Sequence, residues 1–111
     1  MSPDGTTIAF SRLDAHYTWD VCLLRLAQLR VRCITRGRGN EREPAWSPDG
    51  ERIVFSGDAQ GGTLGRRTIY SIGADGSSLR ALTSGAIDAS GPSWDPHGSS
   101  LVYALRNVVR R

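Results

Sequence analysis

Residues 46–56 read Trp46-Ser47-Pro48-Asp49-Gly50-Glu51-Arg52-Ile53-Val54-Phe55-Ser56, and variants of this pattern begin at Met1 and at Trp94. The Ser-Pro-Asp-Gly part predicts a tight hairpin turn, because proline holds φ at about −65° and glycine accepts the left-handed conformation that ends the turn. The residues after the turn alternate in polarity, so that Ile53 and Phe55 share one face. Each copy therefore predicts a β-turn followed by a β-strand.

The repeat extends well beyond this turn. Residues 20–35 align with residues 68–83 without a gap at an offset of 48, whereas Ser2 aligns with Ser47 at an offset of 45. Periods in the forties, with four strands in each unit, are typical of a β-propeller blade. We therefore predict an all-β fold of antiparallel β-propeller blades, with about two and a half four-stranded repeats that make an incomplete propeller.

The alignment divides one domain, residues 1–111, into three units. They are a partial blade at 1–35, a complete blade at 43–83 and a partial blade at 92–106. Within the complete blade we expect strands at about 43–46, 51–57, 67–73 and 78–83. The two partial blades lack neighbours for their outermost strands, and open strand edges invite pairing with another chain. Self-association through open sheet edges is therefore expected.

The recurring elements also resemble a known family. In order, they are the Trp-Ser-Pro-Asp-Gly turn, the Arg-Ile-Val-Phe-Ser strand, Ile69-Tyr70-Ser71-Ile72, Ala74-Asp75-Gly76-Ser77 and Leu79-Arg80-Ala81-Leu82-Thr83. Together they resemble the TolB-type, WD-like propeller repeat. The resemblance implies a non-catalytic scaffold of the bacterial cell envelope or periplasm that mediates protein–protein or peptide interaction, although the chain starts with no recognisable signal peptide. The same repeat builds the N-terminal propellers of prolyl-oligopeptidase and dipeptidyl-peptidase type serine peptidases, and a fragment of such a propeller is the alternative.

Composition and motifs exclude several other functions. The net charge is only +3, although all fourteen basic residues are arginines, which favours a protein or peptide partner over nucleic acid. The chain contains no apolar run long enough to span a membrane. It has neither a Gly-x-Ser-x-Gly nucleophile motif nor a glycine-rich phosphate loop, so we expect no catalytic residue and no enzyme activity. Two cysteines and two distant histidines do not have the spacing of metal ligands, so no metal and no cofactor are expected.

The two cysteines lie on a predicted hairpin. If Ala27-Gln28 forms a two-residue turn, Cys22 lies directly opposite Cys33. This register places the apolar residues on one face, which we predict to be the core side, and Arg25, Arg30 and Arg32 on the other. The apolar residues are Cys22, Leu24, Leu26, Leu29, Val31 and Cys33. The geometry permits a disulfide, but no other feature indicates export, so two buried thiols are the favoured reading.

Strand order predicts where a partner binds. In an up-and-down sheet, the repeat-fixed turns such as residues 47–50 share one end, which we name the turn end. The loops that differ between copies, at about 13–18, 36–42, 58–66 and 84–90, share the opposite end, which we name the loop end. Divergent loops are free to bind. The candidate partner-binding residues are His16, Tyr17, Trp19, Arg36, Arg38, Arg42, Arg66 and Arg67.

The arginines of the loop end have two interpretations. They suit a carboxylate-bearing peptide or a phosphate. Alternatively, they belong to solvated loops in which Glu41 and Glu43 screen their charge, and this second interpretation is the favoured one.

Overall fold

The computed structural model describes residues 1–15, 17–35, 40–58, 67–83, 88–95 and 100–106. These residues form three antiparallel sheets and contain no helix. The first sheet has the order β1 (Thr7–Leu13), β2 (Trp19–Arg25), β3 (Arg30–Cys33). The second has the order β4 (Glu41–Trp46), β5 (Arg52–Gly57), β6 (Thr68–Gly73), β7 (Arg80–Ala81), and the third pairs β8 (Asp88–Trp94) with β9 (Leu101–Arg106).

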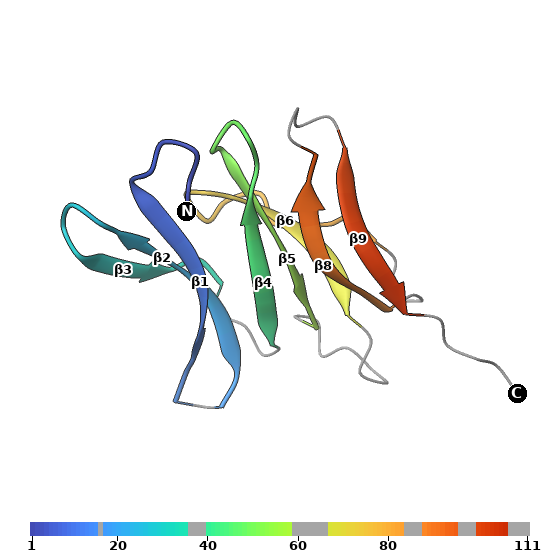
Figure 1. The fold of residues 1–111 in the computed structure, drawn as a ribbon. Coiled ribbons are helices and arrows are strands. Elements are labelled where there is room, and N and C mark those ends of the chain that lie inside the picture. The colour runs from blue at the N-terminus through green and yellow to red at the C-terminus, as the bar shows by residue number, and fades with distance from the viewer. Residues whose placement is uncertain (16, 36–39, 59–66, 84–87, 96–99, 107–111) are drawn as a thin grey trace, which may run out of the picture.

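The sheets stand side by side like neighbouring blades. Figure 1 shows β4 between β1 and β8, and β4 contacts both of these strands. Consecutive strands pair within each sheet, as the propeller repeat requires. The predicted fold class, antiparallel β-propeller blades in an incomplete propeller, is confirmed.

The first strand of the second blade and that of the third begin earlier than the sequence predicted. β4 starts at Glu41 and β8 at Asp88, ahead of the expected starts at residues 43 and 92. Each strand accommodates a proline by a bulge, since the register shifts between Arg42 and Ala45 and, in the sister strand, between Ser90 and Ser93. The strand therefore continues on the far side of the proline.

The repeated turn has the expected geometry. The Gly50 amide donates to the Ser47 carbonyl at 2.9 Å, and Gly50 has φ +75°. The Asp49 carboxylate accepts hydrogen bonds from the Ser47 hydroxyl at 2.5 Å and from the Glu51 amide at 2.9 Å. These bonds explain why serine and aspartate recur at these positions.

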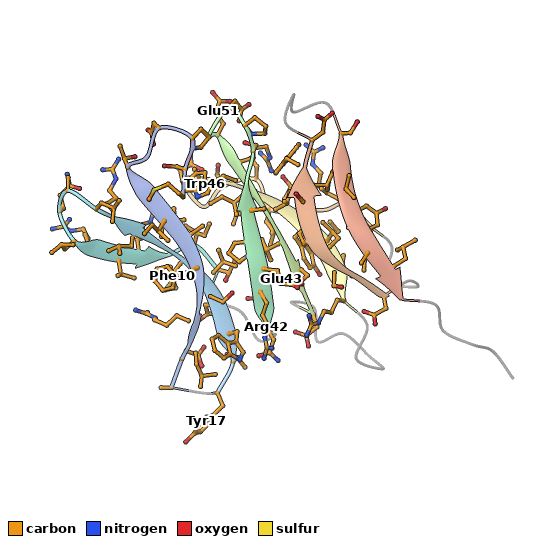
Figure 2. The ribbon with its side chains drawn as sticks, viewed as in Figure 1. Phe10, Tyr17, Arg42, Glu43, Trp46 and Glu51 are labelled. Carbon is orange, nitrogen blue, oxygen red and sulfur yellow. A yellow bond between two sulfur atoms is a disulfide. The ribbon has the colours of Figure 1, made fainter. Side chains whose placement is uncertain are left out.

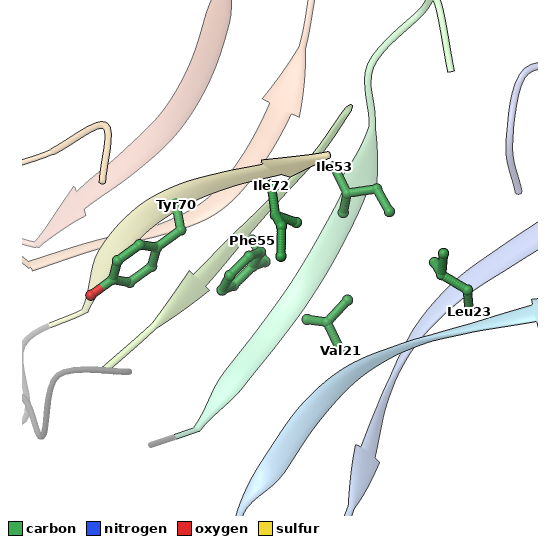
Figure 3. Packing of buried hydrophobic residues seen from close by; sticks show 6 residues of the cluster. All are labelled: Val21, Leu23, Ile53, Phe55, Tyr70 and Ile72. Carbon is green, nitrogen blue, oxygen red and sulfur yellow. The ribbon is translucent and has the colours of Figure 1, made fainter. Parts of the chain in front are cut away.

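The core lies between the first and second sheets. Val21 and Leu23 of β2 face an apolar surface made by β5 and β6 (Figure 3). That surface consists of Ile53, Phe55, Tyr70 and Ile72, and the Phe55 and Tyr70 rings stack with centroids 5.5 Å apart. The opposite face of the second sheet is also buried, because Val54 and Ile69 have no exposed surface. A complete blade thus packs on both faces.

The predicted core side of the β2–β3 hairpin is wrong. The alternation was grouped correctly, since Cys22 pairs with Cys33 and Arg25 with Arg30. However, Val31 is 42% exposed and Leu29 is 77% exposed, whereas the other face supplies Val21 and Leu23 to the core. The prediction was wrong because the arginines occupy the second face only near the hairpin tip, whereas Val21 and Leu23 occupy the same face further from the tip.

The preference for free thiols is also wrong, because Cys22 and Cys33 form a disulfide. The turn consists of residues 26–29 instead of the predicted two-residue turn. The Ile34 amide donates to the Val21 carbonyl at 2.9 Å, so the cysteines form a pair without hydrogen bonds between them. Such pairs bring Cα atoms close together, and here they lie 3.8 Å apart.

Candidate functional site

Four of the eight predicted partner-binding residues lie in the described part of the chain. They are Tyr17, Trp19, Arg42 and Arg67, whereas His16, Arg36, Arg38 and Arg66 lie outside it. Figure 2 shows Tyr17 and Arg42 at one end of the sheets and Glu51 at the other. These two labelled residues therefore lie at the loop end, as the strand order requires.

Tyr17 is presented by a tight loop between β1 and β2. The Asp14 carboxylate accepts hydrogen bonds from the Thr18 hydroxyl at 2.7 Å and from the Thr18 amide at 3.1 Å. The Tyr17 amide donates to the Asp14 carbonyl at 3.1 Å, and Tyr17 adopts φ +63°. Its side chain is 83% exposed. The loop thus holds an aromatic ring in solvent, where it contributes nothing to the core.

Trp19 and Arg42 connect the first blade to the second. The Arg42 guanidinium lies over the Trp19 ring, 5.0 Å from its centroid, which is within the range of a cation–π interaction. The Trp19 amide donates to the Asn40 side-chain oxygen at 3.0 Å. Both side chains are half-buried. Arg42 therefore has a fixed position on an aromatic surface.

Glu43 connects the second blade to the third. Its Oε1 atom accepts hydrogen bonds from the Ser56 hydroxyl at 2.7 Å and from the Gly91 amide at 3.0 Å. The Arg67 guanidinium lies 3.7 Å from the same oxygen. The Ser56 bond, the Gly91 bond and Arg67 lower the pKa of Glu43. We name this arrangement the bulge latch, because Glu43 and Gly91 lie in the two strand bulges.

Glu41 is buried in the same strand. It has no exposed surface, and neither carboxyl oxygen makes a hydrogen bond of good geometry within the described residues. Burial is the main cause that raises the pKa of Glu41 from 4.5 to about 7. The carboxyls of Asp20 and Asp58 act in the same direction, and the Thr35 hydroxyl opposes them. Glu41 is thus an acid that the fold keeps partly protonated near neutral pH.

The roles of both glutamates differ from those expected from the sequence. Both were expected to screen the charge of the loop arginines, which holds in part for Glu43 but not for Glu41. One signal was available, because the offset of 48 aligns Glu41 with Ala89 and Glu43 with Gly91. Ala89 is fully buried and Gly91 has φ +61°. In both copies the first position is thus buried, and the second has a positive φ, which glycine adopts most readily.

A cavity lies at the turn end, between the first two blades. This cavity of about 610 Å³ is lined on the first blade by Leu23, Arg25, Arg30 and Arg32. On the second blade it is lined by Trp46 and by the turns that carry Asp49 and Asp75. We name it the interblade cleft. None of the four predicted partner-binding residues that the structure describes lines this cleft.

Neither a cluster of metal-ligating side chains nor a membrane-spanning helix occurs among the described residues. No group of three or more histidine, cysteine, aspartate or glutamate side chains is placed to hold a metal ion. Nor does that part of the chain contain a helix of the length and apolarity needed to cross a membrane.

Comparison with known proteins relates this chain to propeller proteins. The TolB beta propeller domain family matches residues 1–110. A relative from Bacillus subtilis (strain 168), named uncharacterized peptidase YuxL, is 27% identical over 109 residues. The match covers 94% of this chain but only 16% of that protein. The chain thus spans about a sixth of the length of this relative.

Solved structures give the same picture. The putative TolB from Agrobacterium tumefaciens has a TM-score of 0.86 at 25% identity, over 96% of this chain and 36% of that one. TolB from Acinetobacter baumannii has a TM-score of 0.71 at 23% identity, over 92% and 24% of the two chains. At this identity the second likeness concerns the fold alone.

Proposed function

Because the chain belongs to the TolB β-propeller family, we propose that it is a non-catalytic binding segment of a propeller, which takes a protein or peptide partner at the loop end. The observation that supports this proposal is that the exposed Tyr17 side chain and the Trp19–Arg42 stack lie at the same end of the blades. Tyrosine, tryptophan and arginine are the residues that most often dominate binding energy at protein interfaces.

The positions of these side chains suit recognition more than stability. Tyr17 buries little surface, so its ring is available to a partner. Arg42 is held on Trp19, which reduces the conformational entropy that a binding arginine loses. Arg67 supplies a second cation, and its guanidinium forms a long ion pair of 3.7 Å with Glu43. A peptide that carries a carboxylate matches this set of groups.

The disulfide bears on the compartment in which the chain works. Disulfides persist in oxidising environments and are rare in the cytosol. The Cys22–Cys33 bond therefore supports a place in the bacterial cell envelope, such as the periplasm, for the propeller that contains this segment.

A selection experiment tests the binding proposal. Peptides are selected on the immobilised chain from a phage-displayed library, and the affinity of the enriched peptides is measured by calorimetry. The double variant Tyr17→Ala/Arg42→Ala is expected to weaken binding at least about tenfold. Arg80→Ala, in the exposed strand β7, is the matched control. Equal affinities for the wild type and the double variant contradict the proposed site.

One observation favours a second function. The relative YuxL carries the word peptidase in its name, and the same repeat builds the N-terminal propellers of serine peptidases. In that case the chain is part of a gating propeller, and a separate domain performs the hydrolysis. The chain alone is then expected to remain unlabelled by a fluorophosphonate probe of serine hydrolases. A downstream reading frame with a Gly-x-Ser-x-Gly motif supports this alternative, and labelling of the chain itself overturns the non-catalytic assignment.

A further inference from the structure

The β2–β3 hairpin carries a pair of like charges at its tip. Arg25 and Arg30 face each other directly across the two strands. Like charges in this position destabilise a hairpin. Among the residues that the structure describes, neither guanidinium makes a hydrogen bond or an ion pair. Within that part of the chain, no side chain offsets the repulsion between the two charges.

The repeat shows that the fold does not need this pair. At the offset of 48, Arg25 aligns with Gly73 and Arg30 with Ser78 in the second blade. Arg32 aligns with Arg80, which is exposed on β7. Two of the three arginines are thus specific to the first blade.

All three arginines line one wall of the interblade cleft. The Arg32 guanidinium crosses the cleft and donates to the Asp75 carbonyl at 2.7 Å. This bond joins the two blades and leaves Arg25 and Arg30 on the same wall, beside an apolar floor that includes Leu23 and Trp46. The cleft therefore combines unengaged cations with apolar surface.

Three aspartates, Asp4, Asp49 and Asp75, also line the cleft, and hydrogen bonds within their own turns hold their carboxylates in place. The Asp49 carboxylate is bonded to Ser47 and Glu51, and the Asp75 carboxylate to the amide and hydroxyl of Ser77. In the first blade's own turn, hydrogen bonds from Ser2 and Thr6 lower the pKa of Asp4 to about 2. These carboxylates remain ionised, but among the described residues none of them forms an ion pair with Arg25 or Arg30. A carboxylate of a ligand can therefore still bind that pair of arginines.

We propose that the interblade cleft at the turn end binds an acidic, extended peptide segment, whose carboxylates are held by Arg25 and Arg30 and whose apolar parts lie on Leu23 and Trp46. Guanidinium groups bind carboxylates through paired hydrogen bonds. This is a second binding site, at the end opposite the one proposed above, and it stands or falls independently of that site.

The test uses the whole chain and a defined probe. Binding of fluorescein-labelled hexaglutamate is measured by anisotropy at low and at physiological ionic strength, with a neutral Gly-Ser hexapeptide as reference. The variants are Arg25→Gln/Arg30→Gln, the control Arg80→Gln, and the loop-end variant Arg42→Gln/Arg67→Gln. Unchanged circular dichroism checks that each variant is folded. Because the pair is exposed and repulsive, its replacement is expected to leave the fold intact.

We expect hexaglutamate to bind the wild type and the Arg80 variant equally, and the Arg25/Arg30 variant at least about tenfold more weakly. In ¹⁵N correlation spectra, the peptide is expected to shift the amide signals of residues 23–32 and 46–50. Failure of hexaglutamate to bind, or equal affinity for the Arg25/Arg30 variant, overturns the proposal. A loss confined to the Arg42/Arg67 variant overturns the cleft and supports the loop end instead. If inorganic phosphate displaces the peptide and binds more tightly than it, the ligand is a phosphate and the assignment to a peptide carboxylate is wrong.

Discussion

Replacing Glu41 by glutamine should stabilise the protein, and the gain should depend on pH. Glu41 is fully buried, and its carboxyl oxygens lack hydrogen-bond partners of good geometry within the described residues. Its ionised form is therefore disfavoured in the folded state and normal in the unfolded state. The folded protein keeps a proton that the unfolded chain releases between pH 4.5 and about pH 7. Stability must consequently fall as the pH rises through this window.

The pKa shift sets the magnitude. A rise from 4.5 to about 7 corresponds to about 3 kcal/mol of unfolding free energy, since one pKa unit is worth about 1.4 kcal/mol. Glutamine has nearly the same shape and cannot ionise. The variant Glu41→Gln should thus match the wild type near pH 4.5 and exceed it by up to about 3 kcal/mol at pH 8.

Urea unfolding, followed by tryptophan fluorescence across this pH range, measures the difference. Glu51→Gln is the matched control, because it removes a glutamate from an exposed turn position (Figure 2), and its effect should be small at every pH. A carbon-detected titration of the Glu41 carboxyl gives its pKa directly. A midpoint near 4.5, or a Glu41→Gln variant less stable than the wild type at pH 8, refutes the reasoning, because either result means that the carboxylate has a partner.

Three further outcomes are expected. Glu43→Gln should lower the unfolding free energy by only about 1 kcal/mol at neutral pH, because the carboxylate is half-exposed. The pKa of Glu43 is lowered from 4.5, so the difference in stability from the wild type should shrink as the pH falls below 4.5. A difference that does not depend on pH argues against the bulge latch. The variant Cys22→Ala/Cys33→Ala, or reduction of the wild type, should lower the unfolding free energy by about 3 kcal/mol, because the disulfide closes a loop between residues 11 positions apart. Unchanged midpoints of urea unfolding would mean that the bond adds no stability. The isolated chain should self-associate through its outer blades, where Val31 and Val102 are exposed; sedimentation as a single monomeric species contradicts this.

The repeat made most of the fold predictable. A turn with a proline and a glycine, followed by an alternating strand, fixes the hairpin, and three copies fix the blade. The position of Cys22 opposite Cys33 also followed from the register alone, although the disulfide was not the favoured interpretation. These features are local, so they depend on residues close together in the sequence.

The candidate site was less predictable, because it depends on contacts between blades. Glu41 is buried by neighbouring strands, and nothing in its local sequence distinguishes it from a solvated loop residue. The same holds for the hairpin faces, where Val21 and Leu23 contact a blade 30 or more positions away in the chain. Only the comparison of Glu41 with Ala89, at the sister position, carried this information in the sequence.

The bulge latch has a consequence for how such blades can be duplicated. Its acceptor is a side chain on one blade, and its donor is a main-chain amide on the next. Any residue except proline supplies that amide, but only a residue like Glu43 supplies the carboxylate. Gly91 donates the bond through its amide and, having no side chain, offers no acceptor to a blade beyond it. In a series of tandem copies of the second blade, each copy would therefore supply a Glu43 carboxylate to the amide of the next copy. A copy of the third blade would have no side chain at this position to form the bond.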